Sequence, residues 1–167
     1  ILCSRADEKV YLYDKNGILN SEISSDSFYG NFCVEKDAVY AYDYKKSAIV
    51  QIVKDGEFLS NPVSIQNAIS FRTIRNMIAL DGKLYVLAIP FTSENAETFF
   101  DFGLEEFKDY GEVVYSINIE NGQYQTLDLE HIAAEYASED GRLFFYGWKE
   151  DKYYLYEYDT ERDKITK

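Results

Sequence analysis

The chain has 167 residues, about the size of one domain, and 46% of them are hydrophobic, enough to bury a substantial core. Its 30 acidic and 17 basic side chains give a net charge of −13, which repels phosphate backbones and anionic lipids, so we expect neither nucleic-acid nor peripheral membrane binding. The longest apolar run, Leu84–Phe91, is far shorter than the roughly 20 residues of a membrane span, so no membrane insertion is predicted.

Along the chain, a short apolar strand followed by a turn and an aromatic-bearing strand occurs four times. The second strands begin at Val10, Val39, Leu84 and Leu143. Such a unit cannot bury its own apolar surface and has to stack on a neighbour. The intervals between these strands are 29, 45 and 59 residues, and the last becomes 40 when an insertion at 92–110 is removed. Four-stranded propeller blades repeat every 40–45 residues or so.

The predicted fold is therefore all-β: a β-propeller-like array of about four antiparallel blades, with one short helical insertion. The array is either complete or part of a larger propeller, and its first unit is short enough to be a partial blade. The chain starts at Ile1 inside a strand pattern, with no signal peptide, so we expect a processed or truncated piece of something longer. The repeats of the single predicted domain lie near residues 1–30, 31–66, 67–131 and 132–167.

Five glycines directly follow Asp or Asn, the residues that supply the positive φ angles of tight hairpin turns. Four of these pairs sit between clear strand patterns, which predicts a meander of antiparallel hairpins. The pairs are Asn16-Gly17, Asp55-Gly56, Asp81-Gly82, Asn121-Gly122 and Asp140-Gly141, of which Asp55-Gly56 is the one without clear flanking strands.

The strands Val10–Tyr13, Val39–Tyr42 and Tyr154–Tyr156 are apolar or aromatic at both odd and even positions. A sheet wetted on one side alternates apolar with charged residues instead. We therefore expect both faces of these strands to be covered by neighbouring sheets.

Strands of the form apolar-Tyr-x-apolar-Asp, followed by a turn, occur at Val10–Gly17, Val39–Asp43, Val114–Gly122 and Leu155–Asp159. In this feature the chain resembles bacterial extracytoplasmic β-propeller repeat proteins with NHL-like or PQQ-like blades. The resemblance implies a propeller architecture and an extracytoplasmic location. It does not imply a chemistry, because such propellers include binding proteins, scaffolds and enzymes.

Two cysteines, Cys3 and Cys33, occupy the same place in the first two repeats. They could form a disulfide in an oxidising compartment, or remain two buried free thiols. We favour the free thiols, because stacked sheets lie about 10 Å apart and Cα atoms more than about 7 Å apart cannot be bridged.

The insertion Thr92–Tyr110 interrupts the strand pattern. Phe100, Leu104 and Phe107 recur at helical spacing, which predicts one or two short helical turns. Long insertions are often functional, and aromatic anchors in a polar rim are typical of interaction sites. Alternatively, the phenylalanines cover the end of the sheet stack.

The candidate binding residues are mostly in this insertion. Trp148, at the end of a strand, either stacks on a sugar or fills space between blades. The full candidate set is Phe99, Asp101, Phe102, Glu105, Phe107, Tyr110 and Trp148.

Catalytic and cofactor signals are weak. The single histidine, His131, has no accompanying nucleophile motif, no His and Cys cluster has metal-ligand spacing, and no glycine-rich phosphate loop is present. We therefore predict no metal and no cofactor. Paired carboxylates such as Asp101 with Glu105, or Glu105 with Glu106, would suit glycoside hydrolysis, but neighbouring acids are expected by chance among 30.

The leading hypothesis is a non-catalytic interaction or ligand-recognition module. Its partner would be a protein or a small molecule such as a carbohydrate, and an exposed sheet edge could also pair with another copy. The alternatives are a carbohydrate-active hydrolase and a purely structural segment of a larger secreted protein.

Overall fold

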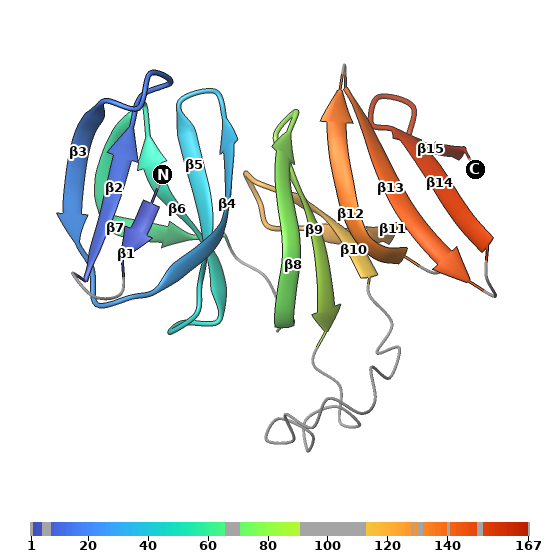
Figure 1. The fold of residues 1–167 in the computed structure, drawn as a ribbon, viewed down its shortest axis with the longest axis horizontal. Helices are drawn as coiled ribbons and strands as arrows, with labels where there is room; N and C mark the ends of the chain where they lie inside the picture. Colours follow the sequence, from blue (N-terminus) through green and yellow to red (C-terminus); the bar gives the residue numbers. More distant parts are fainter. Residues whose placement is uncertain are drawn as a thin grey trace.

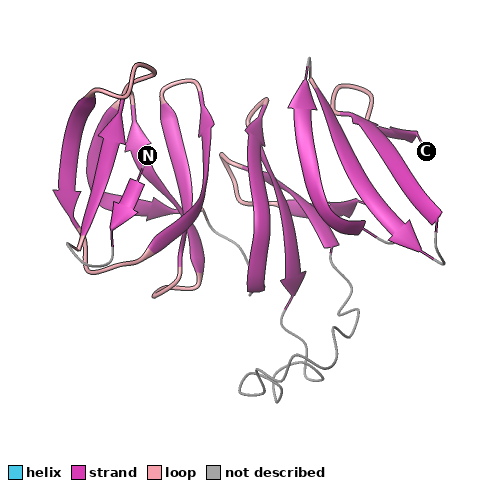
Figure 2. Cartoon of the chain, viewed as in Figure 1, coloured by secondary structure: helices cyan, strands magenta, loops and turns pink. Residues whose placement is uncertain are grey.

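The computed structural model describes residues 2–4, 8–65, 71–90, 113–127, 129, 132–139, 141–149 and 152–166. These residues form strands joined by turns, with no helix among them (Figure 2). The all-β prediction is confirmed. The short helix predicted within 92–110 lies outside the described residues.

The strands form four antiparallel sheets, and within each sheet the spatial order follows the chain order. Each sheet is therefore a simple meander. Sheet A holds β1 (Leu2–Ser4), β2 (Lys9–Tyr13) and β3 (Leu19–Ser24); sheet B holds β4 (Tyr29–Glu35), β5 (Ala38–Asp43), β6 (Ala48–Lys54) and β7 (Glu57–Ser64). Sheet C holds β8 (Phe71–Leu80), β9 (Lys83–Pro90), β10 (Val113–Asn118) and β11 (Tyr124–Leu127); sheet D holds β12 (Ile132–Glu139), β13 (Arg142–Lys149), β14 (Lys152–Asp159) and β15 (Lys164–Thr166).

The four sheets follow one another in a row from the N-terminus to the C-terminus (Figure 1). The first strands of sheets B, C and D lie together, because β4 contacts β8 and β8 contacts β12. At the opposite edge, the last strand of sheet A, β3, contacts the last strand of sheet B, β7. Sheets B, C and D thus neighbour one another through their first strands, whereas sheets A and B neighbour each other through their last strands.

The predicted Asx-Gly hairpins are confirmed. Four of the pairs lie between strands that are hydrogen-bonded to each other, including Asp55-Gly56, which joins β6 to β7; in the fifth, Gly141 precedes β13, which pairs with β12, and Asp140 lies outside the described residues. In the β6–β7 turn Asp55 and Gly56 have φ of 51° and 78°, and in the β8–β9 turn Asp81 and Gly82 have φ of 51° and 73°. Two consecutive positive φ values match the right-handed twist of the flanking strands, which is why Asp55-Gly56 and Asp81-Gly82 close tight hairpins. In Asn16-Gly17 and Asn121-Gly122 the glycine has the positive φ and the asparagine does not.

A second type of turn recurs once in each sheet. The side chain that ends a strand accepts backbone N–H groups from residues two to four positions later, at 2.8–3.1 Å. Asp and Asn form such turns because their short side chains reach the following backbone. The four residues are Asp14, which directly follows β2, and Asp43, Asn118 and Asp159, which end β5, β10 and β14. Three of them also end the strands of the apolar-Tyr-x-apolar-Asp pattern.

Three apolar cores separate the four sheets. The A–B core joins Val10 to residues of β5 and β6, the B–C core is centred on aromatic and aliphatic side chains of β5, β8, β9 and β10, and the C–D core joins β9 and β10 to β13 and β14. Sheets B and C each contribute to two cores. Their inner strands, including Val39–Tyr42, are therefore covered on both faces, as predicted, whereas the outer strands β7 and β11 are largely exposed.

The same prediction is wrong for Val10–Tyr13 and Tyr154–Tyr156. In β2, Val10 is buried in the A–B core, but Tyr13, on the opposite face, is exposed. In β14, Tyr156 is buried in the C–D core, but Leu155 is exposed. Sheets A and D are the two ends of the described row, so each packs on a neighbouring sheet through only one face.

Cys33 is a free thiol in the B–C core, which confirms the free-thiol expectation for this residue. The side chain of Cys3 lies outside the described part, although its backbone pairs with Val10 between β1 and β2. Burial, with a smaller contribution from Glu35, raises the pKa of the Cys33 thiol to about 12. The reactive thiolate is thus strongly disfavoured in the folded chain.

We expect Cys33 to resist alkylation in the native protein. At pH 8 its raised pKa lowers the thiolate population on the order of a thousandfold relative to an ordinary cysteine, and burial blocks access as well. The measurement is the rate of iodoacetamide labelling of a Cys3→Ser variant, with and without urea. Native labelling as fast as labelling in urea would contradict the buried position of Cys33.

Asp43 offers a test of the recurring turn. Its carboxylate is fully buried and Oδ1 accepts two backbone N–H groups, so Asp43→Ala should lower the free energy of unfolding by about 1–3 kcal/mol. Asp43→Asn should cost less than about 1 kcal/mol, because the amide oxygen of Asn118 makes the same bonds in sheet C. The measurement is the urea midpoint at unchanged m value, with exposed Glu57→Ala as the control. An equal loss for the Ala and Asn variants would mean that charge, rather than the turn, stabilises this strand end.

Candidate functional site

The sequence-predicted binding residues of the insertion lie outside the described residues. These are Phe99, Asp101, Phe102, Glu105, Phe107 and Tyr110. Trp148 lies on β13, where its backbone pairs with Tyr153 of β14. The insertion site remains a prediction, and the described part of the chain offers a different site.

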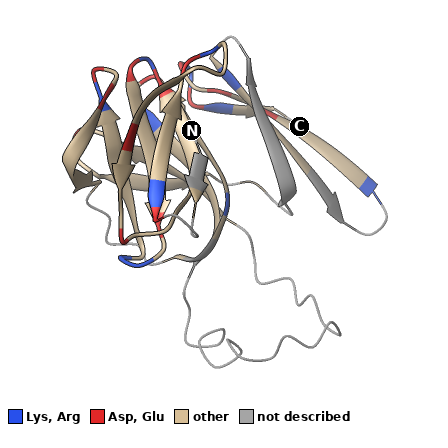
Figure 3. Ribbon diagram, turned by 60° about the vertical axis from the view of Figure 1, so that its left-hand side comes forward, with Lys and Arg blue, Asp and Glu red and all other residues tan. Residues whose placement is uncertain are grey.

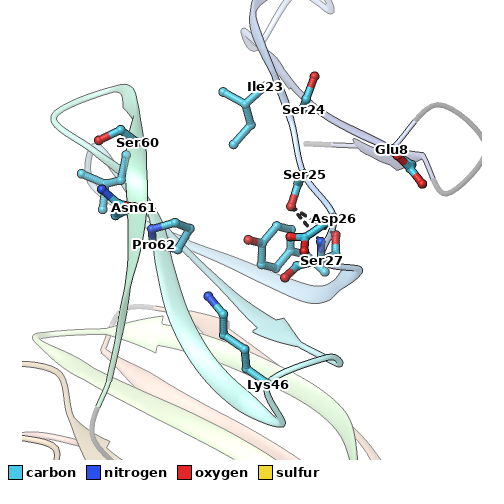
Figure 4. A pocket seen from close by; sticks show the side chains of 12 residues that line it. Glu8, Ile23, Ser24, Ser25, Asp26, Ser27, Lys46, Ser60, Asn61 and Pro62 are labelled. Atoms are coloured by element: carbon cyan, nitrogen blue, oxygen red, sulfur yellow. Dashed lines mark hydrogen bonds between the residues drawn. The ribbon is translucent and has the colours of Figure 1, made fainter.

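A polar pocket of about 390 Å³ lies between the outer strands of sheets A and B. We call it the A–B pocket. One wall comes from the end of β3 and the connection to β4, and the opposite wall comes from β7 (Figure 4). The lining residues are Glu8, Ile23, Ser24, Ser25, Asp26, Ser27, Tyr29, Lys46, Leu59, Ser60, Asn61 and Pro62.

A serine turn shapes the first wall. The Ser25 hydroxyl accepts the Ser27 N–H at 3.1 Å and donates to the Ser27 carbonyl at 3.3 Å. The Ser25 N–H in turn donates to the Glu8 carbonyl at 2.8 Å, which ties this connection to the start of sheet A. These bonds hold the 24–27 segment in one conformation, so its polar groups are set in place before a ligand arrives.

Lys46 enters the pocket from the β5–β6 turn, with its amino group directed between Pro62 and Ser27 (Figure 4). Its Nζ lies 3.7 Å from Oδ2 of the fully buried Asp43. Oδ2 accepts no hydrogen bond from the described residues, so Lys46 is the group that compensates its charge. The turn that ends β5 thereby also holds the Lys46 ammonium at the pocket floor.

Asp26 brings a carboxylate to the same pocket. A hydrogen bond from Lys45, together with the charge of that ammonium, lowers the pKa of Asp26, and Asp26 correspondingly raises the pKa of Lys45. Asp26 is therefore ionised at neutral pH. The pocket thus presents one ammonium, two acidic side chains, four serine hydroxyls and one carboxamide within a small volume.

The arrangement is suited to hydrogen bonding. Serine hydroxyls both donate and accept, and the Asn61 amide does the same with separate atoms. Ile23, Leu59 and Pro62 add apolar surface to the lining. A concavity of this size with both polar and apolar lining residues is typical of small-molecule sites.

The described residues give no geometric support to a carboxylate hydrolase. Among them, the two carboxyl groups with a shifted pKa are Asp14 and Asp26, and both are lowered by hydrogen bonds rather than raised as a general acid requires. The pairs named from the sequence, Asp101 with Glu105 and Glu105 with Glu106, are outside the described part of the chain.

Metal and membrane features can be stated for the same residues. Over the described ranges, no three His, Cys, Asp or Glu side chains gather to hold a metal ion. The described residues also contain no helix that could cross a lipid bilayer. Many of the described charges lie at the turns that close the strands (Figure 3).

A smaller hollow of about 220 Å³ lies between sheets C and D, lined by Asp81, Lys83, Tyr85, Thr160 and Glu161. Burial raises the pKa of Tyr85. This hollow has fewer polar groups and half the space of the A–B pocket, so we treat it as secondary.

Sequence reasoning missed the A–B pocket. Its clearest sequence signal is the small, polar Ser24-Ser25-Asp26-Ser27 run between two strands, which resembles any surface connection. The opposite wall, Leu59–Pro62, lies more than 30 residues further along the chain. Only the packing of β3 beside β7 brings the two together.

No family model matches the chain, and no curated protein matches its sequence. The site is therefore judged on its own geometry.

The serine turn yields a prediction. Ser25→Ala removes the acceptor of the Ser27 N–H, so amide hydrogen exchange at Ser27 should speed up, by a factor on the order of ten, which corresponds to about 1 kcal/mol. The measurement is exchange followed by NMR, with Ser60→Ala on the opposite wall as the control. Unchanged protection of Ser27 would show that the turn does not order this wall.

Proposed function

We propose that the protein is a non-catalytic recognition module of β-propeller-like architecture that binds a small, uncharged, hydroxyl-rich ligand, such as a mono- or disaccharide, in the A–B pocket. The observation that carries this proposal is one concavity of about 390 Å³ whose lining includes four serines and Asn61. The insertion at 92–110 remains a second candidate interaction site on the evidence of its composition.

The propeller-like arrangement is supported by the order of packing. Each meander packs on the next through a shared apolar core, and the first strands β4, β8 and β12 neighbour one another in turn. Radial repetition of four-stranded sheets around their first strands is the propeller arrangement.

The ligand class follows from the lining. Hydroxyl and amide groups exchange hydrogen bonds with sugar hydroxyls, while Ile23, Leu59 and Pro62 can contact the apolar faces of a sugar ring. An anionic ligand is a poorer match despite Lys46, because Glu8 and Asp26 share the lining and the chain carries a net charge of −13. A cationic ligand would meet the Lys46 ammonium. A neutral ligand avoids both conflicts.

Sugar binding can be tested directly by NMR. Titration with a panel of glucose, galactose, N-acetylglucosamine, maltose and lactose should produce saturable amide shifts at Ser24–Ser27 and Asn61. Asn61→Ala, which removes one hydrogen-bonding group from the wall, should weaken the affinity about 5- to 10-fold.

The matched control is Gln125→Ala, an exposed substitution on β11 of sheet C, which should leave the affinity unchanged. Shifts confined to residues outside the pocket, or no shifts with any sugar of the panel, would count against the assignment of the pocket to this ligand class.

A further inference from the structure

The β7 wall of the A–B pocket is an interruption of the sheet ladder. The register of β6 and β7 passes directly from the pair Val53–Phe58 to the pair Gln51–Val63. Four residues of β7, Leu59–Pro62, therefore lie opposite a single residue of β6, Ile52. We call these four residues the β7 bulge. In a regular antiparallel pair one residue lies opposite one residue, so the bulge is longer than the ladder requires.

The last strands of sheets C and D form without such a bulge. β10 pairs with β11 in unbroken register from Val114–Leu127 to Ile117–Tyr124, and β14 pairs with β15 in unbroken register from Glu157–Thr166 to Asp159–Lys164. Sheet C is the closer comparison, because an Asx-Gly turn joins β10 to β11 just as one joins β6 to β7. The β7 bulge is thus particular to sheet B and is not a requirement of a four-stranded meander of this kind.

The bulged residues of β7 are the same residues that line the A–B pocket. All four, Leu59 to Pro62, belong to the lining. The other four residues of β7, Glu57, Phe58, Val63 and Ser64, pair with β6 and do not belong to it. Bulges near binding sites redirect side chains that a regular strand would point elsewhere. This coincidence links the bulge to the pocket.

The bulge contributes little to the core beneath it. Ile52, which lies opposite the bulge, is fully buried in the A–B core, and Phe58 packs against that core, but no residue of the bulge belongs to it. Pro62 fits this position because proline cannot donate to a ladder and is confined to edges and bulges within sheets. Figure 4 shows Pro62 on the pocket side of β7, facing the 25–27 segment.

We infer that the β7 bulge is the specificity-determining element of the A–B pocket and that the fold itself does not require it. The inference rests on the proposed function, because it takes the ligand to be the neutral, hydroxyl-rich molecule proposed for this pocket. Asn61 carries separate donor and acceptor atoms, and Pro62 is rigid and apolar. Sugars that differ in the direction of one hydroxyl meet such a wall differently, and a site that hydrogen-bonds a hydroxyl discriminates against a ligand that misplaces it.

Protection of the edge of sheet B is the other role open to the bulge. Bulges and prolines in edge strands hinder pairing with a second chain. The match between the bulged residues and the lining residues favours the binding role, since protection of an edge does not require those residues to face a pocket.

The test replaces Leu59–Pro62 with a single threonine, which restores one residue opposite Ile52. NMR titration with glucose, galactose, N-acetylglucosamine, maltose and lactose gives the affinities of this variant and of the unaltered protein. Urea unfolding gives the stability of each, and sedimentation velocity gives its association state. Gln125→Thr, in the regular last strand of sheet C, is the control for adding a threonine to such a strand.

We expect the shortened variant to have an unchanged association state and a urea midpoint no lower than that of the unaltered protein. Its affinity for the tightest-binding sugar should be weaker about tenfold or more, because the hydrogen-bonding groups of one wall are gone. The differences in affinity between sugars should also shrink, since the remaining 24–27 wall and Lys46 are the same for every ligand.

Three results overturn the inference and leave the proposed function standing. A lower urea midpoint, or a variant that does not fold, means that the fold requires the bulge. New self-association of the variant means that the bulge protects the edge of sheet B. Unchanged affinities, or an equal loss for every sugar, mean that the bulge does not select the ligand. If no sugar binds the unaltered protein, the proposed function fails and the inference fails with it.

Discussion

A sheet that is apolar on both faces has to be covered twice, and this constraint organises the whole molecule. In β5, Val39 and Ala41 pack toward sheet A, while Tyr40 and Tyr42 pack toward sheet C. No two-layer sandwich satisfies such a strand, because its second face would remain in water. A row in which sheets B and C each pack between two neighbouring sheets satisfies it, and three separate cores are the result.

The turns decide where the polar groups of this row can gather. Asp43 ends β5 and fixes the following turn with a buried carboxylate, and the same carboxylate sets the position of the Lys46 ammonium. Strand ends are the natural place for such groups, since the strand centres are occupied by apolar packing. The A–B pocket therefore forms at the outer edge of two sheets, where the turn after β5 and the connection after β3 face β7.

The sequence was sufficient to predict the hairpin turns. It was not sufficient to predict which sheets pack on one another. Asp55-Gly56 and Asp81-Gly82 predicted their hairpins because the positive φ values are a property of two adjacent residues. The two-sided pattern of Val39–Tyr42 predicted double coverage correctly, whereas the similar pattern of Tyr154–Tyr156 predicted it wrongly. Apolar residues at both odd and even positions show only that both faces of a strand are suited to burial. Whether a neighbouring sheet is there depends on its place in the row, which no local pattern encodes.

Leu155 and Val114 illustrate that a local pattern does not determine whether a side chain is buried. Both stand four residues before the turn residue of a third strand, and both are the kind of side chain that a core requires, yet one is buried and the other exposed. An isolated exposed leucine needs no explanation, but a leucine continuous with Tyr146 and Tyr153 on a sheet face is an apolar area of the kind that marks an interaction surface.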